Sequence, residues 1–247
     1  MKSEVRIING LPELVVDDEV VTRSICRPQF PSFLAPDKLD QFLPAGYDVY
    51  FTELFNYPDN LFWDGEDEFD LEVYYHHIDR IVEKAPNCRL IPFIGSRSGP
   101  PYKWARSHIG ELARYNDGKP LNMASLGSEI WWKDYHRALQ TVAGEFERSR
   151  FSDRIIGYNI IYSINEWFGY GALYDNGPYP DYSEPMVRYF RDHLRSWYDG
   201  DVDRLRNAWR DPDVTFNTAA IPGLDKRLSQ RFDGFITCAA PWGMQVA

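Results

Sequence analysis

Residues 154–165 read RIIGYNIIYSIN, an almost continuous apolar run that ends in a polar residue. Such a run is typical of a strand buried on both faces, as in a parallel sheet covered by helices. Glu166 and Trp167 follow it directly, so a carboxylate and an aromatic ring come where the strand would end. We therefore predict a strand over 154–165 with a candidate site at its carboxyl end.

Strands and helices are predicted to alternate ahead of this run. Residues 47–55 (YDVYFTELF) and 89–95 (RLIPFIG) are rich in β-branched and aromatic residues, which favours two more strands. Apolar residues recur at helical spacing over 70–85 and again over 135–146, which predicts amphipathic helices. The order indicates an α/β fold, either a barrel or a doubly wound sheet.

The opening of the chain is expected to form a hairpin. Residues 14–26 (LVVDDEVVTRSIC) place three acidic residues between pairs of valines. Asp17 and Asp18 would make the turn, and a first buried strand would follow over 20–26.

The residues that follow the predicted strands favour the barrel. Neither a G-x-G-x-x-G nor a G-x-x-x-x-G-K-S/T loop follows the first strand, which disfavours a nucleotide-dependent α/β enzyme. Polar and aromatic side chains stand there instead, and a barrel would bring them together on one face. They are Arg27, Glu53, Arg97, Trp104, Asn165, Glu166 and Trp167.

Composition excludes several classes of protein. The 247 residues are 44% apolar, enough for one sizeable core, and carry a net charge of −10 that would repel nucleic acid. No apolar run approaches the roughly 20 residues that span a membrane, and the first residues do not resemble a signal peptide, so we expect a cytoplasmic protein. Three widely spaced cysteines predict buried, reduced thiols.

Glu166 is the strongest candidate for catalysis. A carboxyl group next to an apolar strand is partly desolvated, which raises its pKa and suits a general acid. The Asn165 amide could bind a sugar hydroxyl, and the aromatic content of 16% suits either sugar stacking or core packing. From the residues alone, a glutamate satisfied structurally by a helix N-terminus or an arginine is the other open interpretation.

The motif Asn165-Glu166-Trp167 at the end of a fourth strand resembles the acid/base motif of the clan A glycoside hydrolases. Residues 154–158 (RIIGY), 181–183 (DYS) with the helix after them, and 203–209 (DRLRNAW) resemble the family 42 β-galactosidases in order and spacing. The resemblance covers about residues 10–222. It implies a (β/α)8 barrel of which about half is present, and retaining hydrolysis of a β-linked sugar.

The resemblance assigns the acid/base role to Glu166 and implies a nucleophile on a seventh strand, beyond the four strands predicted here. We therefore expect a partial catalytic domain over 1–222 and a divergent tail over 223–247, the product of truncation or a frame shift. Arg27, Glu53, Arg97, Trp104, Asn165 and Trp167 are the expected substrate-binding residues.

Two alternatives stay open at this point. Glu53 is either a second carboxylate of the cleft or an ion-pair partner of Arg27 or Arg97. The chain is either an enzyme or a non-catalytic barrel fragment that binds carbohydrate or associates with itself through open sheet edges. No cofactor is expected. No metal is expected either, because the adjacent His76 and His77 would face different directions on a helix. The expected partners are a carbohydrate substrate and further copies of the chain, with neither nucleic acid nor membrane.

Overall fold

The computed structural model describes residues 2–21, 25–26, 40, 43–55, 62–96, 99–162, 180–223, 231–232 and 235–236. The chain divides into two compact units. The first comprises residues 1–104 and 135–169, and the second comprises 105–134 and 170–247. Most of the predicted tail over 223–247 lies outside the described residues, so its separate character stays a prediction.

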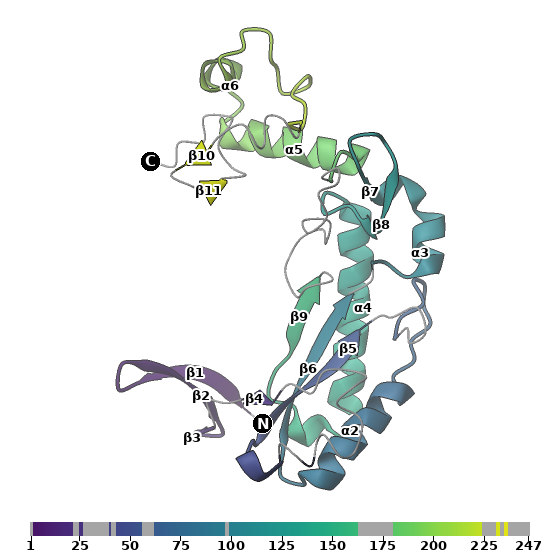
Figure 1. The fold of residues 1–247 in the computed structure, drawn as a ribbon, viewed down its shortest axis with the longest axis vertical. Coiled ribbons are helices and arrows are strands. Elements are labelled where there is room, and N and C mark those ends of the chain that lie inside the picture. The colour runs from purple at the N-terminus through teal and green to yellow at the C-terminus, as the bar shows by residue number, and fades with distance from the viewer. Residues whose placement is uncertain are drawn as a thin grey trace. The chain divides into compact units, whose positions relative to one another are not determined.

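A four-stranded parallel sheet forms the first unit, in the order β4 (Ile25–Cys26), β5 (Val49–Phe55), β6 (Arg89–Ser96) and β9 (Asn159–Tyr162). Figure 1 shows β5, β6 and β9 side by side. Among the described residues this sheet does not close on itself. The predicted α/β class with a parallel sheet and an incomplete barrel is therefore confirmed.

Helices α2 (Glu72–Lys84) and α4 (Glu129–Arg148) lie along the sheet in Figure 1. Tyr75 of α2 contacts Phe146 of α4 edge to face, with ring centroids 5.9 Å apart. Residues on both faces of the sheet are buried, because Tyr50 and Val49 alternate along β5 and neither is exposed. This double burial explains why the strands read as continuous apolar runs.

The chain opens with a three-stranded antiparallel sheet of β1 (Ser3–Ile8), β2 (Leu11–Val16) and β3 (Glu19–Val20). Asp17 and Asp18, both with positive φ, form the turn between β2 and β3, as predicted. Val16 packs with Val49 and Ile156 in one buried cluster. Since Val49 is the first residue of β5, this antiparallel hairpin of β1, β2 and β3 covers the amino-terminal end of the parallel sheet.

The second unit contains the antiparallel pair β7 (Leu112–Arg114) and β8 (Pro120–Ala124), the first turns of α4, and helices α5 (Glu184–Trp197) and α6 (Val202–Trp209). A short pair, β10 (Arg231–Phe232) and β11 (Phe235–Ile236), lies near the C-terminus. Helices α5 and α6 and the segments that follow them share one cluster of buried apolar residues. Its members are Leu194, Tyr198, Leu205, Val214, Phe216 and Ala219.

The structure departs from the predicted elements at two places. Helix α3 (Tyr102–Ser107) and short 3-10 turns at Leu43–Ala45, Ile109–Glu111 and Ser152–Arg154 were not expected. The strand expected from residue 154 begins regular pairing only at Asn159. Leu90 pairs with Ile155 and Phe93 with Asn159, so one extra residue interrupts the ladder between them.

No described helix is both long and apolar enough to cross a membrane.

Candidate functional site

The predicted site requires the parallel strands to end at the same height in the sheet, and their carboxyl ends do so. Phe55 at the end of β5 is in register with Gly95, and Ser96 at the end of β6 is in register with Tyr162 at the end of β9. The three strands therefore end within one residue of each other. Side chains that follow them in sequence start from the same edge of the sheet, where barrel enzymes place their chemistry.

Most of the predicted site residues lie outside the described residues: Arg27, Arg97, Asn165, Glu166 and Trp167. Each of these residues follows a described strand closely in sequence. Arg27 directly follows β4, Arg97 directly follows β6, and Glu166 comes four residues after the last residue of β9. All five residues thus follow strands of one parallel sheet, and their roles stay predictions.

Glu53 belongs to β5 and lies two residues before its end. The register pairs it with Phe93 on β6, and Phe93 in turn with Asn159 on β9. Phe51, two residues earlier on β5, contacts Phe93 edge to face, with ring centroids 5.5 Å apart. Glu53 thus lies within a strand of the sheet, whereas the other predicted residues at this edge follow the strand ends.

Trp104 is buried in helix α3, with 1% of its surface exposed. A Cβ added at Gly65 would lie 2.8 Å from the Trp104 Cβ, so the two backbones approach closely there. In this structure the ring packs inside the protein and offers no open face to a ligand. A packing role is what the described residues show, and contact with substrate stays a prediction.

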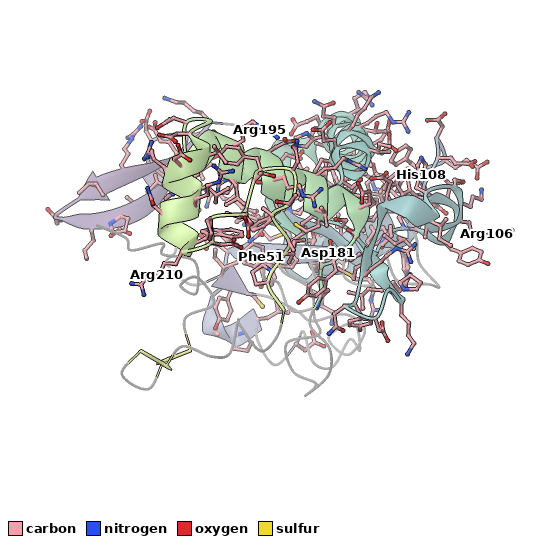
Figure 2. The ribbon with its side chains drawn as sticks, turned by 90° about the horizontal axis from the view of Figure 1, so that it is seen from above. Phe51, Arg106, His108, Asp181, Arg195 and Arg210 are labelled. Atoms are coloured by element: carbon pink, nitrogen blue, oxygen red, sulfur yellow. The ribbon has the colours of Figure 1, made fainter. Side chains whose placement is uncertain are left out.

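Sequence reasoning missed a buried polar cluster in the second unit. Asp181 is 4% exposed, and its Oδ1 accepts hydrogen bonds from the backbone amides of Arg114 (3.0 Å) and Ser183 (2.8 Å). The Ser125 hydroxyl donates to Oδ2 at 2.7 Å and accepts from the Ser183 hydroxyl at 3.0 Å. Asp181, labelled in Figure 2, comes three residues before helix α5.

This cluster links three segments that are distant in sequence. The Ser183 hydroxyl also caps α5 by accepting from the Met186 amide. Because each oxygen of the Asp181 carboxylate accepts at least one hydrogen bond, the group is suited to fixing the backbone and poorly suited to attacking a substrate. The short polar run DYS ahead of an amphipathic helix was the one signal that the sequence offered for this cluster.

The amino-terminal end of the sheet carries a groove of about 460 Å³. Arg89 pairs with Asp48 there at 3.4 Å, and the Arg154 guanidinium donates to the backbone carbonyls of Pro86 and Cys88. These polar groups form an ion pair with one another and hydrogen bonds with the backbone just before β6. The groove lies at the end of the sheet opposite to the predicted site, so it does not form part of that site.

Buried titratable groups in the first unit support a tightly packed interior. Burial raises the pKa of the Tyr50 hydroxyl to about 12 and raises the pKa of the Cys26 and Cys88 thiols. Both thiols are free and buried, as predicted, while Cys238 lies outside the described residues. Within the described part of the chain, no group of three or more histidine, cysteine or acidic residues could hold a metal ion.

Comparison with known proteins defines the class of fold. No protein-family model matches the sequence, and no curated protein matches it. Solved structures do match. A β-galactosidase from the psychrophilic Marinomonas ef1 aligns over 81% of this chain and 29% of its own, with 16% identity and a TM-score of 0.58. A GH42 β-galactosidase from G. stearothermophilus aligns over 79% and 27%, with 15% identity and a TM-score of 0.55.

The catalytic domain of a β-amylase from Paenibacillus polymyxa aligns over 90% of this chain and 58% of its own, with 16% identity and a TM-score of 0.60. The fold therefore resembles part of the barrel in these enzymes, and the expected likeness to the family 42 β-galactosidases is confirmed at the level of fold. The chain spans less than a third of the length of the β-galactosidases that it matches.

Proposed function

We propose that this chain is the part of a retaining glycoside hydrolase that supplies the general acid/base, Glu166, for cleavage of a β-linked sugar. The observation that carries the proposal is the register of the parallel sheet. Strands β5, β6 and β9 end level, and the sequence puts Glu53, Arg97 and Glu166 at or just after those ends. The fold likeness to β-galactosidases supports the same reaction class.

In this reaction Glu166 protonates the glycosidic oxygen as the bond to the sugar breaks, and then removes a proton from the incoming water. Asn165 would donate a hydrogen bond to the sugar, and Trp167 would offer a ring for stacking. A carboxyl group at the end of an apolar strand suits the first step, because desolvation helps it to hold a proton near neutral pH.

Retaining hydrolysis also needs a nucleophilic carboxylate about 5–5.5 Å from the acid/base. Glu53 is the first residue to test for that role, because β5 and β9 are both neighbours of β6 and the register links Glu53 to Asn159 through Phe93. The alternative is that the nucleophile belongs to a part of the barrel that this chain does not supply. Turnover by the 247-residue chain distinguishes the two.

The test is hydrolysis of a panel of aryl β-glycosides by the purified chain and its Glu166→Gln variant. We expect the variant to lose about 10²- to 10⁴-fold in rate, the usual contribution of a general acid. The loss should shrink with a dinitrophenyl leaving group, which departs without protonation. Glu83→Gln, an exposed glutamate of α2, is the matched control and should change nothing.

Turnover that Glu166→Gln leaves intact would contradict the proposed role. A folded chain that binds sugars without turnover would instead support a non-catalytic carbohydrate-binding function. Binding that is lost in Asn165→Ala and Trp167→Ala, measured by calorimetry, would then place the sugar at the same strand end.

A further inference from the structure

Strand β1 presents an open edge. Among the residues that the structure describes, β1 pairs with β2 alone, from Ser3 opposite Val16 to Ile8 opposite Leu11. The Lys2 carbonyl accepts a hydrogen bond from the Asp17 amide at 2.9 Å, so even-numbered residues direct their backbone groups toward β2. The N–H and C=O groups of the odd-numbered residues, Ser3, Val5 and Ile7, therefore point away from the sheet toward the open edge.

The same strand carries exposed apolar side chains. Val5 is 69% exposed and Ile7 is 71% exposed, although both belong to a regular strand. The outward backbone groups of this edge pair with no described residue, and its β-branched side chains are exposed, so the strand is suited to pairing with another strand.

The charges on β1 indicate which strand would pair. Glu4 and Arg6 flank Val5 symmetrically. If a second β1 runs antiparallel with Val5 opposite Val5, Glu4 of each copy lies opposite Arg6 of the other. Opposite charges in such cross-strand positions stabilise a pair, and like charges destabilise it. Within one copy Arg6 contacts Glu4 and pairs with Asp18 at 2.6 Å. The Arg6 and Glu4 side chains are 40% and 37% exposed, so both reach solvent and can exchange partners.

We propose that two copies of this chain associate through their β1 strands, antiparallel and centred on Val5. The two three-stranded sheets then form one continuous six-stranded sheet around a two-fold axis. Three residues of each copy, Ser3, Val5 and Ile7, supply the backbone hydrogen bonds. Since the hairpin covers the amino-terminal end of the parallel sheet, this interface lies away from the strand ends that carry the predicted catalytic residues.

The first test removes the backbone donor at the centre of the interface. Val5→Pro deletes an N–H that is not used by the β1–β2 ladder, and proline is tolerated on an open edge of this kind. We expect the unchanged chain to show dimers in sedimentation velocity as its concentration rises from about 1 µM to about 100 µM. Val5→Pro should remain monomeric with an unchanged circular dichroism spectrum, while Val5→Thr, which keeps the N–H, should still dimerise.

The second test reads the register and does not depend on proline. Glu4→Arg and Arg6→Glu each place like charges opposite each other in the homodimer, and each should weaken it about tenfold. An equimolar mixture of the two variants restores both opposite-charge pairs, so heterodimers should form at the concentrations at which the original chain dimerises. The double variant Glu4→Arg/Arg6→Glu should dimerise as the original does.

A chain that stays monomeric over the whole concentration range would overturn the proposal. So would a dimer that persists in Val5→Pro, or a mixture of the two charge variants that forms no heterodimer, because either result places the association on another surface. Aryl-glycoside hydrolysis should be unaffected by Val5→Pro, so this proposal and the catalytic one fail separately.

Discussion

The two compact units of the chain are stabilised in different ways. In the first unit, apolar side chains from β5, β6 and the helices bury both faces of a parallel sheet. In the second, a buried aspartate and two serines link β7, the loop after β8 and the start of α5, beside a small apolar cluster. Apolar burial is non-directional and tolerates adjustment, whereas a buried polar cluster fails when one partner is removed.

The largest expected effect is at Asp181. Replacing it with alanine leaves the Ser125 hydroxyl and the amides of Arg114 and Ser183 without an acceptor in a buried place, which should cost about 3 kcal/mol. Urea unfolding measures the loss, and hydrogen exchange should localise it to the second unit. Asp181→Asn keeps one carbonyl oxygen and should cost about 1 kcal/mol. Equal losses for Asp181→Ala and for the exposed Asp213→Ala would contradict the importance of the cluster.

A matched pair of glycines compares the packing of the two units. An alanine Cβ at Gly127 would lie 2.7 Å from the Met186 Cα and 2.8 Å from the Pro185 carbonyl oxygen, both backbone atoms of the segment that starts α5. Gly127→Ala should therefore destabilise by about 1–3 kcal/mol. Gly157, ahead of β9 in the first unit, has no atom within 4 Å of such a Cβ. Gly157→Ala should change the melting temperature little, and a similar drop in both variants would rule out the close approach as the cause.

The smallest expected effect is a pH dependence in the first unit. Burial, aided by the positive charges of His76 and Arg80, lowers the pKa of His77 from 6.5 to about 4. Between these two values the unfolded chain binds a proton that the folded chain does not. His77 therefore does not reduce the free energy of unfolding above pH 6.5, and it reduces this free energy as the pH drops toward 4.

Because His77 is only partly buried, solvent screening limits this effect to about 1 kcal/mol. His77→Gln should flatten the change in unfolding free energy between pH 6.5 and pH 4, relative to the exposed His136→Gln. Identical pH profiles for the two variants would show that His77 does not contribute.

Local patterns predicted the regular elements of the first unit closely. The strands expected over 47–55 and 89–95 are β5 and β6, and the helix expected over 70–85 is α2. Each is coded by residues adjacent along the chain, through alternation or helical spacing. The turn at Asn9 and Gly10, both with positive φ, was a readable signal for β1 that the sequence interpretation missed.

The class of sheet and the placement of polar residues after its strands could be read from the sequence, because both follow from short-range periodicity. The level strand ends, the buried position of Trp104 and the hydrogen bond between Ser125 and Asp181 became evident only in the folded chain. Ser125 and Asp181 are 56 positions apart, and Arg114 and Asp181 are 67 apart. Contacts over such separations depend on how the whole chain packs, which no local pattern encodes.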